Sequence, residues 1–324
     1  MKLLIQTGKT YIVKYPGISV WIATSPLAPR NDNAKMNPQT MTFSEEKFKQ
    51  GTSYLMPFEK MHGLGNDFVI INNMHLPEDA NEAYEKGLCK KICDRNRGIG
   101  ADGMIIIDQV KDSEEAIRSW RFYNADGSIA EMCGNGIRCA AKYIYEHGLS
   151  GEAASFKIET LAGDLSIEML DEEEVKVDMG APKEIKKDLS LNIGDFNFDY
   201  EFVSMGNPHA VGFFDDIEAV KNFGAEIETH SDFPNKTNVE FAKLKNPTEI
   251  DLVVWERACG FTEACGTGAC ATAVAAIERG LAQKDTDIKV NLPGGTLTIK
   301  WDSITNSIFM TGKAEMTFIG YYNS

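Results

Sequence analysis

The chain lacks several features that would place it in a common class. Its 324 residues contain no apolar run near the ~20 residues that span a bilayer. Basic residues are too few to balance the acidic ones, with 33 Lys and Arg against 48 Asp and Glu and a net charge of -15. This charge argues against a surface for nucleic acids or anionic membranes. Otherwise, 43% hydrophobic and 25% charged residues are typical of a globular protein.

The cysteines lack the pattern of a disulfide framework or a metal site. Seven cysteines are an odd number in a chain of this length, which favours free thiols in a reducing compartment. Cys89 and Cys93 do not have zinc-ribbon spacing, and no second pair stands at metal-ligand spacing from them. We therefore expect no metal ion and a cytoplasmic protein, with a plastid as the alternative location.

The first 56 residues differ from the rest. The first 40 hold five Lys or Arg and one acid, Asp32, which faintly resembles a transit peptide without its enrichment in Arg and Ser. Pro16 and Gly17 interrupt any secretory hydrophobic region. We expect residues 1–56 to form a poorly ordered N-terminal extension.

Residues 131–148 carry the first chemical signal. Cys133 precedes Gly134-Asn135-Gly136, and apolar residues then recur at helical spacing until Gly148, a typical C-terminal stop. A helix N-terminus favours a thiolate, and its free N–H groups bind carboxylates. The stretch predicts a nucleophile or base beside an anion-binding turn. The alternative is a buried cysteine next to a glycine turn.

This segment recurs 132 positions later. Cys133 matches Cys265, Gly148 matches Gly280, and the strands around the two helices also match. So long a period implies two similar domains, each with short strands that bury their apolar faces on a central helix. We expect an α+β fold of two pseudo-symmetric domains, each a β-barrel-like sheet around a central helix. Both helix N-termini would then point at one cleft, with Cys133 and Cys265 facing across it.

The predicted domains follow from the repeat. The first would comprise residues 57–178 and 311–324 and carry Cys133, and the second would comprise residues 179–310 and carry Cys265.

Two facing thiols can invert a stereocentre without a cofactor. A thiolate removes a proton from one face of a carbon, and a thiol returns a proton to the other face. Two helix N-termini aimed at an α-carboxylate would stabilise the charge that develops. One cysteine must then be a thiolate and the other a thiol, and His209 and Glu256 are the candidates to set these states.

Several polar residues at loop tips suit a zwitterionic substrate. Any one of the asparagines alone is a common turn former, but Arg257 among them can bind a carboxylate through two hydrogen bonds. The set comprises Asn66, Asn124, Asn207, Asn238 and Arg257.

These residues closely resemble the diaminopimelate epimerase family from about Phe58 to the C-terminus. The stretches that carry the resemblance are Met61-His62-Gly63-Leu64-Gly65-Asn66-Asp67-Phe68, Phe122-Tyr123-Asn124-Ala125-Asp126-Gly127-Ser128, Cys133-Gly134-Asn135-Gly136-Ile137-Arg138-Cys139, Gly206-Asn207-Pro208-His209, Thr237-Asn238-Val239, Glu256-Arg257, Ala264-Cys265-Gly266-Thr267-Gly268-Ala269-Cys270 and Leu292-Pro293-Gly294-Gly295.

The resemblance implies a cofactor-independent homodimer that interconverts LL- and meso-diaminopimelate in the synthesis of lysine and, in many bacteria, peptidoglycan. It makes Cys133 and Cys265 the catalytic bases, supported by His209 and Glu256. The implied substrate contacts are Asn66, Asn124, Asn207, Asn238, Glu256 and Arg257, with the amides of Gly134, Asn135, Gly266 and Thr267 on the reacting carboxylate.

The chain departs from the family pattern at two positions. Gly103 stands where some relatives have a glutamine that contacts the substrate, and Phe318 stands where some have a tyrosine at the dimer contact.

Other interpretations of the sequence are compatible with these motifs. Proline racemase-like enzymes share the paired thiols but usually have histidine in place of Asn135, and the branch related to phenazine biosynthesis generally lacks the cysteine pair. A cofactor-independent racemase of another amino acid, such as histidine, is the main alternative. A non-enzymatic binding protein on the same fold would not need both thiols.

Overall fold

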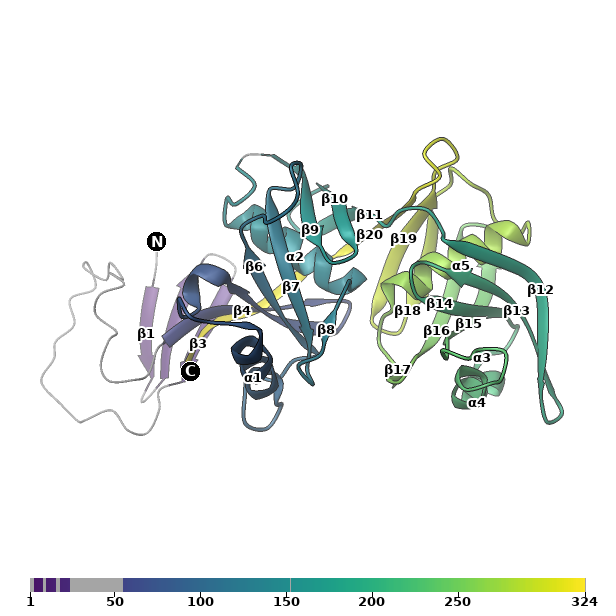
Figure 1. Ribbon diagram of the computed structural model, residues 1–324, viewed down its shortest axis with the longest axis horizontal. Helices are drawn as coiled ribbons and strands as arrows, with labels where there is room; N and C mark the ends of the chain where they lie inside the picture. The colour runs from purple at the N-terminus through teal and green to yellow at the C-terminus, as the bar shows by residue number, and fades with distance from the viewer. Residues whose placement is uncertain (1–2, 8–9, 16–17, 24–54, 152, 324) are drawn as a thin grey trace, which may run out of the picture.

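A computed structural model describes residues 3–7, 10–15, 18–23, 55–151 and 153–323 of the chain. Strands β1 (Leu3–Thr7), β2 (Thr10–Tyr15) and β3 (Ile18–Ala23) form a small antiparallel sheet beside the rest of the molecule (Figure 1). A poorly ordered extension was expected over residues 1–56, and apart from these three strands and residues 55–56 that segment lies outside the described residues. None of the described helices is long and apolar enough to cross a membrane.

Strands dominate the first half of the repeat. They are β4 (Leu55–Gly63), β5 (Asn66–Asn72), β6 (Gly103–Asp108), β7 (Arg118–Asn124), β8 (Ile129–Ala130), β9 (Ser155–Thr160), β10 (Gly163–Met169) and β11 (Glu174–Asp178). The helices of this half are the 3-10 turn η2 (Asn73–His75), α1 (Glu82–Cys93) and α2 (Gly134–Glu146). Asn81 caps the N-terminus of α1 through Oδ1, which accepts from the Tyr84 N–H.

The second half has the same character. Its strands are β12 (Glu184–Ile193), β13 (Phe196–Ser204), β14 (Pro208–Phe213), β15 (Asn238–Asn246), β16 (Glu249–Glu256), β17 (Gly260–Phe261), β18 (Ile288–Leu292), β19 (Gly295–Trp301) and β20 (Ile308–Lys313), and β21 (Glu315–Asn323) ends the chain. Its long helix is α5 (Gly266–Glu278). Three short helical pieces follow one another between β14 and β15: α3 (Ile217–Val220), η3 (Lys221–Phe223) and α4 (Gly224–Glu228).

Strand pairing confirms the internal repeat. In the first half, β4–β5 is antiparallel, β5–β6 parallel, β6–β7 antiparallel, β7–β9 parallel, and β9–β10–β11 antiparallel. The same sequence of directions runs through β13, β14, β15, β16, β18, β19 and β20. Strand β12 pairs with β13 as the C-terminal β21 pairs with β4. The last strand of the chain therefore completes the first half.

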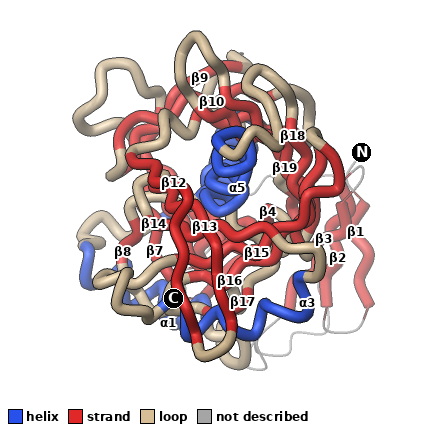
Figure 2. The backbone as a smooth tube through the Cα atoms, turned by 90° about the vertical axis from the view of Figure 1, so that its right-hand side faces the viewer, coloured by secondary structure: helices blue, strands red, loops and turns tan. Residues whose placement is uncertain are grey.

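Each half surrounds one buried helix. Helix α2 buries Ile137, Ala140, Ala141 and Ile144 among the strands of the first half. Helix α5 consists mostly of small residues and is buried along most of its length. Figure 2 shows strands on several sides of α5. Helix α2 ends before Gly148, whose positive φ of 65° fits the predicted stop.

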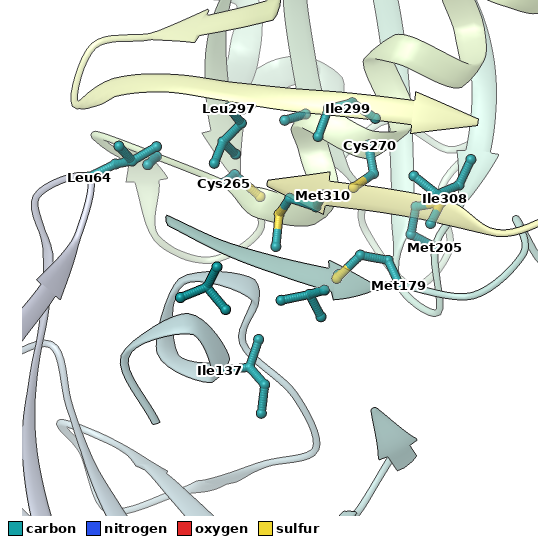
Figure 3. Packing of buried hydrophobic residues seen from close by; sticks show 14 of the residues in the cluster. Leu64, Ile137, Met179, Met205, Cys265, Cys270, Leu297, Ile299, Ile308 and Met310 are labelled. Atoms are coloured by element: carbon teal, nitrogen blue, oxygen red, sulfur yellow. The ribbon is translucent and has the colours of Figure 1, made fainter. Parts of the chain in front are cut away.

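The two halves share one packed core. Strand β20 pairs with both β19 and β11, so it joins the second half to the first. Figure 3 shows Ile137 of α2, Met310 of β20, Cys265 at the N-cap of α5 and Cys270 within α5 in this shared cluster. The predicted boundary between residues 310 and 311 falls inside β20. The helix ends are therefore held at a fixed junction by a strand common to both halves.

Candidate active site

Cys133 and Cys265 occupy the same position in the two halves. Each is the N-cap of its helix in an extended conformation, and each thiol sulfur accepts a backbone N–H in the first turn, from Gly136 and Gly268 respectively, both at 3.4 Å. Cys133 is half-buried, whereas Cys265 is only 6% exposed. A cysteine replaces the Ser or Asp that usually caps a helix, so a reactive sulfur stands at each helix N-terminus.

The two helix N-termini meet directly. A Cβ placed on Gly134 would lie 3.3 Å from the Cα of Gly266, and one placed on Gly266 would lie equally close to the Cα of Gly134. The same atom on Gly266 would lie 3.0 Å from Met310 Sδ. A side chain at either position would push the helices apart. Because the first N–H groups of a helix have no partner within it, this junction concentrates donors and positive dipole ends from two directions.

An amide network joins the halves at this junction. The Asn135 side-chain amide donates to Asn66 Oδ1 at 3.2 Å and to the carbonyl oxygen of Ala264 at 2.9 Å. The Cys133 thiol also lies 3.8 Å from Asn66 Oδ1, and Asn66 in turn donates to Asp102 at 2.8 Å. Asn66 and Asn135 therefore connect Cys133 to the residue that precedes Cys265.

A second network lies behind Cys265. Thr267 Oγ1 is 3.6 Å from the Cys265 sulfur and accepts from Asn207 Nδ2 at 3.2 Å. His209 is fully buried, with Nε2 3.0 Å from Asn207 Oδ1 and Nδ1 2.6 Å from Glu240 Oε1. Both ring nitrogens lie within hydrogen-bond distance of an oxygen atom, which fixes the orientation of the ring. The predicted residues Asn207, His209 and Thr267 thus form one continuous relay.

Glu256 stands next to this relay at the end of β16. Its Oε1 accepts from the Thr262 hydroxyl at 2.6 Å. Burial raises the pKa of the Glu256 carboxyl, while the Thr262 hydroxyl, the His209 charge and the Cys265 thiol oppose the rise. A carboxyl with a raised pKa beside a thiol is suited to exchange a proton with it.

Neither thiol has the lowered pKa expected from its helix position. Burial raises the pKa of Cys133 to about 11, and the Gly136 N–H offsets only part of the rise. Burial also raises the pKa of Cys265 well above its ordinary value, and the negative charges of Glu256 and Glu240 add to it. Desolvation and nearby carboxylates therefore outweigh the helix dipole, so both thiols are protonated in this structure.

Two more predicted substrate contacts, Asn124 and Asn238, form hydrogen bonds within the protein itself. Asn124 donates to Ser128 Oγ at 3.0 Å. The Asn238 amide donates to the Pro208 carbonyl at 2.8 Å and accepts from the backbone N–H of Arg257 at 2.9 Å. Asn238 therefore fixes the backbone that carries Arg257.

Arg257 itself is exposed. Its guanidinium lies 3.3 Å from the Asn235 carbonyl and lines a cavity of about 820 Å³ with Lys186, Phe202 and Pro208, among others.

Two buried charged residues near the site were not predicted from the sequence. Glu240 is fully buried on β15, and its Oε2 has no hydrogen-bond partner among the described residues. Arg138 is fully buried on α2. The signal for both was a charged residue within an apolar helix or strand, which only its neighbours in space can explain.

The two departures from the family pattern have structural correlates. A Cβ at Gly103 would lie 2.6 Å from the Phe122 ring and 2.8 Å from the Tyr123 carbonyl, so this position has no room for a glutamine. Phe318 packs edge-to-face on Phe58, with 5.9 Å between the ring centroids. Among the described residues, no group of His, Cys, Asp and Glu is arranged to hold a metal ion.

Comparisons with known proteins agree with this geometry. A family model described as diaminopimelate epimerase matches residues 58–185 and 201–317. Diaminopimelate epimerase from Carboxydothermus hydrogenoformans is 44% identical over 280 residues, covering 82% of this chain and 99% of the relative. The enzyme of the same name from Bacillus cytotoxicus is 44% identical over 287 residues, covering 82% and 96%.

Solved structures share the fold at low sequence identity. A PhzF-family phenazine biosynthesis protein from Bacillus anthracis has a TM-score of 0.65 at 16% identity and covers 83% of this chain and 99% of its own. A hydroxyproline epimerase from Agrobacterium vitis has a TM-score of 0.63 at 15% identity, with 83% and 92% covered. These two show the fold alone, whereas the family model and the close relatives show that the chain belongs to the diaminopimelate epimerase family and is an isomerase.

Proposed function

We propose that the chain epimerises LL-2,6-diaminopimelate to meso-diaminopimelate, in the synthesis of lysine and peptidoglycan precursors, with Cys133 and Cys265 as its two bases. The observation that carries this proposal is the meeting of two helix N-termini, each capped by a cysteine. The names of the relatives supply the substrate. The alternative is a cofactor-independent racemase of another amino acid.

The junction supplies what the reaction needs. The reacting α-carboxylate binds the amides of Gly134, Asn135, Gly266 and Thr267, where both helix dipoles stabilise the negative charge that develops as the α-proton leaves. One sulfur, as thiolate, takes the proton from one face of the α-carbon. The opposite thiol donates its proton to the other face, so the centre is inverted and the two sulfurs exchange roles. The reaction so described needs no cofactor.

One thiol must first lose its proton. Glu256, beside Cys265, accepts that proton, and the relay of His209, Asn207 and Thr267 holds the second half of the site in place. The raised pKa of both thiols makes their thiolates strong bases when they form, which suits the removal of a weakly acidic α-hydrogen.

The rest of the substrate extends away from the junction. Arg257 binds the distal carboxylate, and the asparagines contribute hydrogen bonds as the two halves close on the substrate. The polar groups proposed for this role are Asn66, Asn124, Asn207, Asn238 and Glu256. A substrate with two amino-acid ends offers a second carboxylate to Arg257, whereas a small cyclic amino acid does not.

The domain division of residues 57–178 with 311–324, and 179–310, is part of the proposal. The repeated strand order on either side of β20 supports it. We also propose a cytoplasmic homodimer in which Phe318 lies near the contact between subunits.

Hydrogen exchange in D₂O tests the two-base assignment. The wild-type enzyme should place deuterium on the α-carbon of both LL- and meso-diaminopimelate and interconvert them. Cys133→Ala and Cys265→Ala should each abolish epimerisation, because one face then lacks its acid or base. Any remaining exchange should occur with retention and with one isomer only. Cys259→Ser, at an exposed cysteine, is the matched control and should behave as wild type.

Two outcomes would overturn the assignment. Wild-type enzyme that exchanges no α-hydrogen of either diaminopimelate isomer would reject the substrate, and parallel assays with other amino acids would then test the alternative racemase. Undiminished epimerisation by Cys133→Ala would reject the two-base mechanism.

A further inference from the structure

Arg138 is a fully buried charge without an acidic partner. Its side chain is 0% exposed, and no carboxylate pairs with it in the part of the chain that the structure describes. A buried guanidinium normally pairs with an acid, because removing its charge from water is costly. Such a residue points to an anion that binds nearby.

The donors of Arg138 contact the first turn of α2 and strand β20. Nη1 donates to the Gly134 carbonyl oxygen at 2.9 Å, and Nη2 donates to Asn135 Oδ1 at 3.0 Å. Nε donates to the Lys313 carbonyl at 3.2 Å, at the end of β20. The guanidinium therefore contacts the first turn of α2 and the strand shared by the two halves.

These contacts polarise the groups that face the junction. Gly134 O and Asn135 N–H belong to one peptide group, so a positive charge on the oxygen makes that N–H a stronger donor. The bond to Asn135 Oδ1 acts likewise on the side-chain amide, which donates to Ala264 and Asn66. One guanidinium thus orients and strengthens two donors of Asn135, its backbone N–H and its side-chain amide, at the junction.

We propose that Arg138 is a positioning residue whose charge makes the junction of α2 and α5 electropositive and strengthens the amide that holds the reacting carboxylate. The substrate's α-carboxylate is the counter-ion that the protein itself does not supply. The identity of that anion rests on the proposed function, but the positive potential at the junction does not.

Alkylation of Cys133 measures this potential without substrate. Iodoacetate and iodoacetamide react alike, because the thiolate sulfur forms a bond to carbon and iodide leaves, but only iodoacetate carries a negative charge. Peptide mapping by mass spectrometry gives the rate constant at Cys133 for each reagent. The ratio of the two rate constants cancels changes in thiol pKa and access, so it reports the local potential.

Arg138→Met should lower the iodoacetate-to-iodoacetamide ratio by about tenfold, the loss of one nearby positive charge. Arg138→Lys retains the charge and should stay within about twofold of wild type. Lys142→Met is the matched control, since Lys142 is also buried on α2 but pairs with Glu146 and the Glu172 carbonyl away from the junction. Its ratio should not change.

Turnover provides the second measurement. If the carboxylate is held as proposed, Arg138→Met should lower kcat/KM for α-hydrogen exchange by about a hundredfold, mainly through kcat, because the carboxylate gains charge in the transition state. If Arg138→Met does not fold, as judged by circular dichroism, Arg138→Gln supplies the neutral comparison.

An unchanged alkylation ratio in a folded neutral variant would overturn the inference. An equal fall in the Met and Lys variants would also overturn it, because that result indicates shape and not charge. If the iodoacetate-to-iodoacetamide ratio falls as expected in Arg138→Met but the wild-type enzyme does not turn over diaminopimelate, the proposed substrate is rejected and the role of Arg138 stands.

Discussion

The raised pKa of Cys133 predicts a slow reaction with alkylating reagents at neutral pH. With a pKa of about 11, about one Cys133 thiol in a thousand is ionised at pH 8, compared with about a quarter for an ordinary thiol of pKa ~8.5. The cause is burial, which the backbone N–H groups of Gly136 and Asn135 do not offset. Only the thiolate is alkylated, so the rate should follow the ionised fraction.

The assay is the iodoacetamide rate constant of Cys133 between pH 7 and 10, measured in a Cys259→Ser background to remove the exposed thiol. We expect about a tenfold rise per pH unit and no plateau in this range. A short cysteine peptide gives the reference and should level off above about pH 9. Circular dichroism at each pH confirms that the protein remains folded.

A plateau at or below pH 8 would refute the reasoning. It would show that Cys133 rests as a thiolate, as its helix position alone predicts, and that burial does not control its ionisation. A plateau for Cys265 in the same mapping would assign the resting thiolate to the second half.

The buried pair of Glu240 and His209 gives a second prediction. Glu240→Ala leaves His209 buried without its partner and should cost about 3–5 kcal/mol in the free energy of unfolding by urea. Glu240→Gln keeps a hydrogen bond, so it should lose less stability, but its kcat should fall at least about tenfold. Equal stability of Glu240→Ala and wild type would contradict this prediction. Gly266→Ala adds a Cβ against Gly134 and Met310, so it should cost about 1–3 kcal/mol in unfolding and reduce epimerisation more than its stability loss explains. Full turnover by a folded Gly266→Ala enzyme would show that the close approach of the helices is unnecessary.

The repeat was the part of the fold most accessible from sequence. The spacing of 132 residues between Cys133 and Cys265 reappears as equivalent N-caps, because short-range signals such as a glycine turn and helical periodicity set these positions locally. The sharing of β20 by the two halves was not predicted, since pairing of β20 with β11 depends on residues far apart in the chain.

The site was predicted in its residue types more than in their environment. Cys133, Cys265, His209 and Glu256 could be named from motifs, but their burial could not, and burial reverses the expected direction of the thiol pKa. Glu240 could not be assigned from sequence for the same reason, because its one partner lies on a neighbouring strand. A charged residue within an apolar segment is therefore a useful indication of a buried residue near the site.

The protonated thiols and the positive junction explain each other. Two resting thiolates would be the counter-ions of Arg138, which has no acidic partner among the described residues. They would cancel the positive potential that otherwise attracts an incoming anion. Burial keeps both sulfurs neutral, so the charge of Arg138 and the two helix dipoles remain available until a carboxylate arrives. In the mechanism proposed above, a proton has to leave one thiol once the carboxylate is bound, and Glu256 is the group proposed to accept it. Until then both thiols stay protonated, so we expect them to resist alkylation and oxidation.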